Sequence, residues 1–176
     1  NTSQLRRAYY LLKQSPTNVK MMKAFGASAT PMSFGEVYTA IQQHVIDGAE
    51  NNEFALTNNK HGEVAKYYSY NQHQMVPDML IGNYKFLNNL DPEDKKLFEE
   101  AAKECNKIER EEWDKQVVEA KEIAKDMGVQ FIDVDVNAFK EKVLPLHEQI
   151  LEENPKLKPI YDKIQEANNK AKGGQQ

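Results

Sequence analysis

The residues best suited to binding a small molecule are gathered in one polar loop. Residues 47–52 read DGAENN, so two carboxylates and two adjacent amides follow a helix-like stretch that opens with TPMSFGEV. An amide both donates and accepts hydrogen bonds, so Asn51 and Asn52 can hold a polar ligand without burying a charge. Phe34 stands at the start of the same stretch and offers an aromatic surface. Non-covalent ligand binding is one interpretation of this combination.

Each of these residues also has a structural interpretation. Ser33 and Glu36 have the spacing of a capping box. Phe34 suits an apolar core, and the pair Asp47-Gly48 is typical of a turn. Periodicity alone favours this structural interpretation.

Other chemistries lack their signatures. None of the histidines, His44, His61, His73 and His147, lies at metal-ligand spacing from another His or from Cys on one helical turn, so we expect no metal site. The chain has no G-x-S-x-G, P-loop or G-x-G-x-x-G sequence, and we expect no catalytic residue, no cofactor and no enzymatic activity. Cys105, the only cysteine, has the helical spacing of a small buried residue.

The composition indicates a globular protein. The 176 residues are 40% hydrophobic and 28% charged, with a net charge of −4. The apolar runs are too short to span a membrane, and residues 1–10 lack the apolar core of a signal peptide. Basic residues are interleaved with acidic ones, which argues against a nucleic-acid partner.

The first half of the chain predicts helices around the polar loop. Ser15 and Pro16 begin a helix that Gly26 ends, and an extended piece follows to Met32. A second helix opens at Ser33, with an apolar stripe that runs to Val45. Residues 53–64 predict a further, polar helix.

The second half contains the clearest element. Residues 67–86 predict one or two strands, broken near Pro77. A helix of about 35 residues follows from Asp91 and stops at Gly128, and a short strand follows it. Residues 137–153 predict a helix that Pro145 bends or splits, and residues 158–168 predict a last helix.

One longer motif resembles a known family. The run GASATPMSFGEVYTAIQQHVIDGAEN resembles the signature of the substrate-binding proteins of tripartite ATP-independent periplasmic (TRAP) transporters, the DctP type. The likeness continues through HGEVAKYYSYNQHQ, LDPEDKKLFEEAAKE and MGVQFIDVDVNAFKEKV. It covers residues 15–163, most of the chain.

The resemblance implies an α/β, periplasmic-binding-protein-like (type II) fold, mostly helical, with a small mixed sheet and one long bracing helix. Residues 15–168 are similar to the C-terminal portion of such a protein, after an unplaced segment 1–14 and before a flexible tail 169–176. The family's first domain has no counterpart in this match.

The resemblance also implies site residues. Asn51 matches the family's ligand-binding Asn, and Phe34 matches the aromatic residue that packs on the ligand. Asn52 and His73 lie where neighbouring pocket residues are found, and Gln14 where some members place a polar contact. The family's carboxylate-binding Arg is replaced at the aligned position by Leu11, which departs from the pattern.

Two functions follow as hypotheses. The first is capture of a small organic acid, a carboxylate, by domain closure in the periplasm, followed by delivery to the membrane permease subunits of a TRAP transporter. The second is a truncated scaffold that acts as a helical protein–protein interaction module or a domain-exchanged homodimer and binds no ligand.

Overall fold

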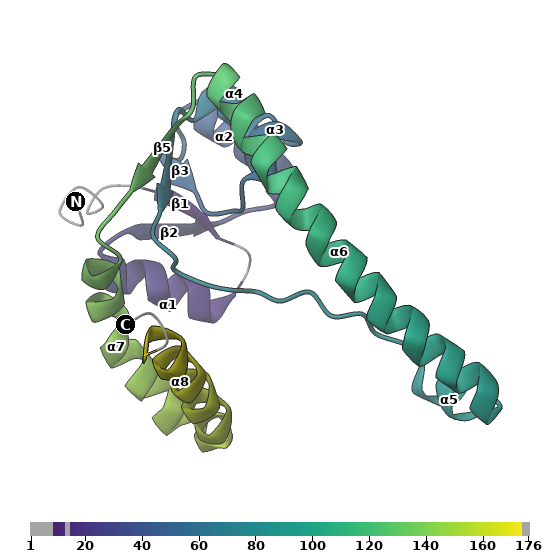
Figure 1. The fold of residues 1–176 in the computed structure, drawn as a ribbon. Coiled ribbons are helices and arrows are strands. Elements are labelled where there is room, and N and C mark those ends of the chain that lie inside the picture. Colours follow the sequence, from purple (N-terminus) through teal and green to yellow (C-terminus); the bar gives the residue numbers. More distant parts are fainter. Residues whose placement is uncertain (1–8, 13–14, 174–176) are drawn as a thin grey trace. The chain divides into compact units, whose positions relative to one another are not determined.

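The structure is a computed structural model that describes residues 9–12 and 15–173 (Figure 1). The elements follow one another as β1 (Tyr9–Leu12), α1 (Pro16–Phe25), β2 (Ser28–Pro31), the 3-10 helix η2 (Phe34–Glu36), α2 (Val37–Gln42), β3 (Gly48–Ala49), α3 (Phe54–Thr57), α4 (His61–Val64), β4 (Tyr67–Tyr70), α5 (Tyr84–Asn88), α6 (Pro92–Asp126), β5 (Gln130–Asp133), α7 (Val136–Glu153), the 3-10 helix η3 (Pro155–Leu157) and α8 (Lys158–Gly173). They form two compact units. The first holds β1, α1, β2, β3, α7 and α8, and the second holds α2 to α6 with β4 and β5.

A small parallel sheet organises the first unit. Its strand order is β2-β1-β3, and Leu11 of β1 is in register with Thr30 of β2 and Ala49 of β3. Sequence reasoning left β1 unplaced, because a four-residue apolar run is too short to show a period. The expected turn at Asp47-Gly48 is also wrong at Gly48, which already lies in β3.

Helices α1 and α7 lie side by side and enclose the core of the first unit (Figure 1). The predicted caps of α1 are confirmed: the Ser15 side chain accepts from the backbone N–H of Asn18, and Gly26 takes φ 86°. Met21, Met22 and Phe25 are buried. The Phe25 ring meets Phe139 of α7 edge to face, with centroids 5.2 Å apart.

Helix α7 runs as one element through Pro145, so of the two outcomes expected from the sequence, a bend or a split, the split is wrong. An Asp135 cap begins the helix: its carboxylate accepts from the backbone N–H groups of Asn137 and Ala138 at 3.0 and 3.3 Å. Helix α8 continues to Gly173, beyond the predicted residues 158–168.

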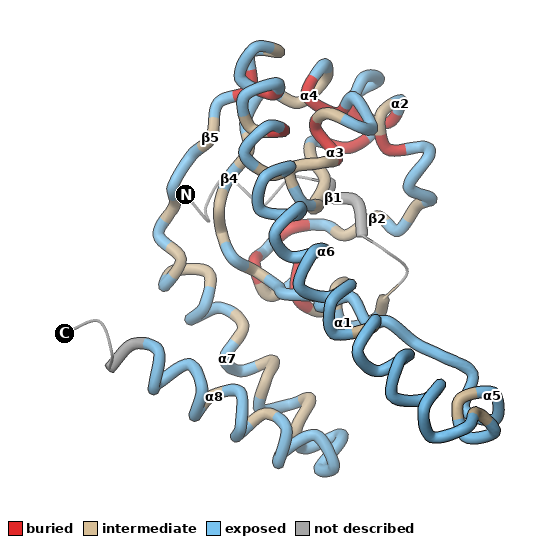
Figure 2. Tube along the Cα trace, turned by 45° about the vertical axis from the view of Figure 1, so that its right-hand side comes forward, coloured by how far each residue is buried: buried red, intermediate tan, exposed pale blue. Residues whose placement is uncertain are grey.

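The long helix predicted after Asp91 is confirmed as α6, with 35 residues, in the second unit. Gly128 follows with φ 85°, a left-handed conformation that suits glycine. The buried residues of α6 lie at its C-terminal end, at Ala120 and Ala124 (Figure 2), and further toward its N-terminus the rings of Phe98 and Trp113 contact Phe86 and Phe54. Residues 91–116 are exposed except Ala102. Cys105 is therefore exposed, which overturns the expectation that it is buried.

Two short helices, α3 and α4, replace the single polar helix predicted for residues 53–64. Lys60 separates them with φ 59°. Their inner side is mainly apolar, since Ala55 and Leu56 are each 5% exposed, and His61, also 5% exposed, is a polar residue buried beside them. Gly62 permits the close packing: a Cβ there would come within 3.1 Å of the Leu56 carbonyl and of the Val129 side chain.

The second helix predicted from Ser33 is shorter than expected. Helix α2 ends at Gln42, so the stripe buries Val37 and Ile41 but leaves Val45 57% exposed. The strand predicted within residues 67–86 is limited to β4, which pairs in parallel with the predicted strand β5. No helix of the described residues is both long and apolar enough for a membrane span.

Candidate ligand-binding site

Two of the predicted site residues follow strands of the first unit's sheet. Phe34 comes three residues after β2, and Asn51 comes two residues after β3. In open parallel sheets, ligands bind outside the carboxyl ends of the strands. Phe34 is 45% exposed, so its ring is accessible at the end of the segment that leaves β2. Gln14 follows β1 and lies outside the described residues.

The Asn51 carboxamide has a defined orientation. Its Oδ1 accepts from the backbone N–H of Asn52 at 2.8 Å, and the Asn51 carbonyl oxygen accepts from the Tyr68 hydroxyl at 2.8 Å. Because Oδ1 faces Asn52, Nδ2 lies on the other side of the carboxamide with two N–H donors. Asn51 therefore offers donors, which suits an anionic or hydroxylated ligand. The side chain of Asn52 is exposed.

The His73 side chain contacts the loop that carries Asn51. Its Nδ1 lies 2.6 Å from Asn71 Oδ1, and its Nε2 lies 3.5 Å from Glu50 Oε2. The backbone N–H of His73 also donates to Asn71 Oδ1, which identifies that atom as the amide oxygen. Both ring nitrogens thus lie near oxygen atoms of neighbouring side chains. The side chains of His73 and Glu50 are only 16% and 12% exposed.

Two tyrosines of β4 support the same loop. The Tyr70 hydroxyl donates to Glu53 Oε1 at 3.0 Å, two residues beyond Asn51. The Tyr70 ring stacks on Phe131 of β5, and Lys121 Nζ lies 4.8 Å from the Tyr70 ring centroid. Burial, helped by the Glu53 carboxylate, raises the pKa of both Tyr68 and Tyr70 well above the ordinary value.

In the second unit, Asn51, Asn52 and His73 thus belong to one network of polar contacts that joins several segments of the chain. Glu50 belongs to the polar loop that the sequence singles out. Sequence reasoning missed Glu53, which directly follows that loop, and three residues from separate segments: Tyr68, Tyr70 and Lys121. The alternation in YYSY was the available signal, since Tyr68 and Tyr70 share one face of a strand. Among residues 9–12 and 15–173, no group of three or more His, Cys, Asp or Glu could hold a metal ion.

Comparison with known proteins agrees with the fold. The family model "Bacterial extracellular solute-binding protein, family 7" (DctP) matches residues 12–154. A TRAP periplasmic solute-binding protein from Anaerococcus prevotii, crystallised with bound D-glucuronate, is 53% identical in sequence to this chain. The match covers 96% of this chain and 55% of that protein, and the two structures superpose with a TM-score of 0.87. A second TRAP periplasmic solute-binding protein, from Xanthobacter autotrophicus, was crystallised with bound β-D-galacturonate and is 36% identical. That match covers 93% of this chain and 54% of that protein, with a TM-score of 0.82.

A curated relative gives the same picture. The Salmonella typhimurium protein YiiZ is 42% identical over 94% of this chain and 50% of its own length. The chain therefore spans about half the length of the relatives that it matches. The predicted fold class is confirmed, with the correction that every strand pair among the described residues is parallel rather than mixed. The alternative of a ligand-free interaction module receives no support from these matches, nor does a homodimer.

Proposed function

We propose that this chain forms part of a periplasmic protein that captures a hexuronate and delivers it to TRAP permease subunits. The proposal starts from the family, since the chain belongs to bacterial extracellular solute-binding protein family 7. The observation that carries the ligand class is the 53% identity, over 96% of this chain, to a protein crystallised with D-glucuronate. A second similar structure holds β-D-galacturonate, which has the same carboxylate on a sugar ring. The function is binding and release, with no covalent step.

In this proposal, each predicted site residue makes a different kind of contact with the ligand. Asn51 donates from Nδ2 to a carboxylate or hydroxyl oxygen of the sugar acid, because its Oδ1 is already engaged by Asn52. Phe34 offers an accessible ring against which the C–H face of a pyranose can pack. The exposed amide of Asn52 can reach a hydroxyl group of the sugar acid. Gln14 stays in the proposal as a predicted polar contact to the ligand.

His73 takes a supporting part in this proposal. Its ring is mostly buried between Asn71 and Glu50, so it positions the loop before Asn51 instead of meeting the ligand. Tyr68 adds a second restraint by donating to the Asn51 carbonyl. A restrained loop loses less conformational entropy when the ligand arrives, which strengthens binding.

The test is a thermal-shift titration of the chain with D-glucuronate, D-galacturonate and, as the uncharged comparison, D-glucose. A ligand at 100 times its dissociation constant adds about 2.7 kcal/mol to the free energy of unfolding. We expect a saturable shift with a uronate and none with glucose. The variant Asn51→Asp should abolish the shift, because it keeps the acceptor for the Asn52 N–H but replaces two donors by a carboxylate oxygen.

Asn58→Asp is the matched control. It makes the same charge change at an exposed amide that follows α3, and its Oδ1 can still accept from the Thr57 hydroxyl. The uronate shift should survive in this variant. Equal shifts with glucose and glucuronate, or a shift that persists in Asn51→Asp, would contradict the proposal.

A further inference from the structure

One lysine of α6 differs in its surroundings from the other lysines of that helix. Lys121 is half-buried, whereas the other lysines of α6 are exposed. Its Nζ lies 4.8 Å from the ring centroid of Tyr70 and 5.9 Å from that of Phe131. An ammonium group within about 6 Å of a ring centroid is attracted by the negative face of the ring. Lys121 therefore joins α6 to the two strands β4 and β5.

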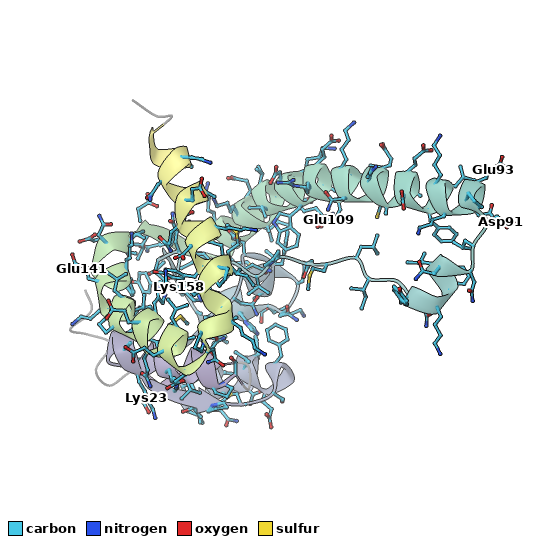
Figure 3. All side chains as sticks on the ribbon, turned by 90° about the horizontal axis from the view of Figure 1, so that it is seen from below. Lys23, Asp91, Glu93, Glu109, Glu141 and Lys158 are labelled. Carbon is cyan, nitrogen blue, oxygen red and sulfur yellow. The ribbon has the colours of Figure 1, made fainter. Side chains whose placement is uncertain are left out.

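The other charged residues of α6 have ordinary surface positions. Figure 3 shows side chains standing off the ribbon along α6, and the labelled Glu93 and Glu109 are exposed. Lys115 Nζ lies 2.6 Å from Oε1 of Glu112 in the preceding turn, and both side chains are exposed. Exposed ion pairs of this kind contribute little to stability. Lys115 is therefore a suitable control for Lys121 on the same helix.

The Tyr70 side chain connects Lys121 to the loop that carries Asn51. We call residues 50–53 the ligand loop. The Tyr70 hydroxyl donates to Glu53 Oε1 at 3.0 Å, at the end of the ligand loop. Because a tyrosine ring is rigid, a cation that fixes the ring also fixes the position of its hydroxyl. All of these residues lie in the second unit.

Helix α6 also holds the residue that follows the ligand loop. Phe54 is the first residue of α3, and its ring meets Trp113 of α6 edge to face with centroids 4.8 Å apart. The start of α3 and the Tyr70 ring are thus both placed by α6. The hydrogen bond between Tyr70 and Glu53 depends on the relative position of these two elements.

We propose that Lys121 is a positioning residue for ligand binding: its ammonium group fixes the Tyr70 ring, and through the Tyr70 hydroxyl it orders the ligand loop before the ligand arrives. The role in binding rests on the proposed function, because it takes Asn51 as the ligand contact. A loop that is already ordered loses less conformational entropy on binding, so the expected effect is on affinity. The ordering of the loop itself can be measured on the chain without ligand.

Hydrogen exchange of single amides, measured by NMR on the free chain, tests this ordering. Two N–H groups serve as reporters. The Asn52 N–H donates to Asn51 Oδ1, and the Leu56 N–H donates to the Glu53 carbonyl oxygen. Val129 is the internal reference, because it is 4% exposed and its N–H is hydrogen-bonded within the core of the same unit.

Two substitutions of Lys121 are compared with one control. Lys121→Met removes the charge and should accelerate exchange of the reporters about threefold or more, with Val129 unchanged within about twofold. Lys121→Arg keeps a cation against the rings and should match the unchanged chain. Lys115→Met makes the same change at an exposed position and should also leave the reporters unchanged. These residues have similar helix propensities, so α6 itself is kept. Lys121→Gln makes the same loss of charge if Lys121→Met does not fold.

Tyr70→Phe tests the route from Lys121 to the loop. This variant keeps the ring that Lys121 contacts but cannot donate to Glu53. In the Tyr70→Phe background, Lys121→Met should therefore have no further effect on the reporters, because the link to the ligand loop is already broken. An effect of Lys121→Met that persists in full in this background would overturn the route through Tyr70.

The affinity for D-glucuronate, obtained by thermal-shift titration, measures the role in binding. Lys121→Met should raise the dissociation constant about threefold or more, whereas Lys121→Arg and Lys115→Met should leave it within about twofold. If the unchanged chain shows no shift with glucuronate, the proposed function fails, and the exchange of the reporters still decides whether Lys121 orders the loop.

Three further results would overturn the proposal. The first is exchange of the reporters that Lys121→Met leaves unchanged. The second is an equal acceleration of Val129, which would assign Lys121 to the general stability of the fold. The third is faster exchange of the reporters without a change in glucuronate affinity, which would separate the order of the loop from binding.

Discussion

At the scale of single residues, the loop that carries Asn51 is held by hydroxyl groups from one face of β4. Tyr68 donates to the Asn51 carbonyl at 2.8 Å, and Tyr70 donates to Glu53 at 3.0 Å. Tyr67, the neighbour of Tyr68, points the other way and is 68% exposed. Within β4, Tyr67 can therefore serve as the control for a substitution of Tyr68.

We predict that Tyr68→Phe lowers the free energy of unfolding by roughly 0.5–1.5 kcal/mol, the usual net value of a hydrogen bond, since the ring is kept and only the hydroxyl is lost. Urea denaturation measures this change. Tyr67→Phe should be close to neutral. If the two variants were equally stable, the Tyr68 hydroxyl would not restrain the loop.

The same tyrosines predict a loss of stability at high pH. Burial raises the pKa of Tyr68 and Tyr70 above their ordinary value of 10.0, so the unfolded chain ionises first. The unfolded state then binds fewer protons than the folded state, and the free energy of unfolding falls as the pH rises through 10.0. Below that pH the contribution is fully present.

Urea unfolding at intervals from about pH 8 to about pH 11 measures this slope, in the range where tyrosine titrates. Changing both Tyr68 and Tyr70 to Phe should flatten it, whereas Tyr67→Phe should not. A slope that is unaffected by the double substitution would assign the alkaline loss to other groups.

At the scale of elements, α7 tolerates a proline that costs it a hydrogen bond. Pro145 lies inside the helix Val136–Glu153 and has no N–H to donate to the preceding turn. Helix α7 persists because Phe139, Val143 and Leu146 pack against the core of α1. Tertiary burial thus overrides the local preference.

Pro145→Ala should therefore stabilise the protein, by about 1–3 kcal/mol, because the helix regains a hydrogen bond and loses a steric clash. Thermal unfolding monitored by circular dichroism tests this. Pro16→Ala is the comparison, since Pro16 occupies the first position of α1, where no N–H partner is lost. A destabilised Pro145→Ala would show that the proline-shaped backbone is needed for packing.

At the scale of the whole molecule, packing is distributed unevenly along α6. Its C-terminal end is covered by Leu56 and Val129, whereas residues 91–116 are exposed except Ala102 (Figure 2). A helical segment that buries little surface opens easily, because most helical stability in proteins comes from packing.

Hydrogen exchange measured by mass spectrometry should show this gradient. We expect amides in residues 95–112 of the chain alone to exchange about tenfold faster or more than those in residues 118–126, because local opening is less costly where burial is low. Leu97, in the first part of α6, is 62% exposed, whereas Ala124, near its C-terminal end, is fully buried. Uniform protection along α6 would contradict the exposed state of its first half.

Elements whose signals are local can be predicted from the amino-acid sequence alone. Ser15 and Gly26 mark the ends of α1, and Asp91 and Gly128 bracket α6, because caps and left-handed glycines act within one turn. The motif from Gly26 to Asn51 also identified the family, and with it the fold class. It named Asn51 and Phe34 as site candidates, which remain predictions.

Which segments meet is known only from the folded chain. The pairing of β1 with β2 and β3, and of β4 with β5, joins residues far apart in sequence, and no local pattern encodes such contacts. The supports of Asn51 come from β4 for the same reason. Exposure is likewise a tertiary property: Cys105 and Leu97 have the helical spacing of core residues, yet both are exposed in the folded chain.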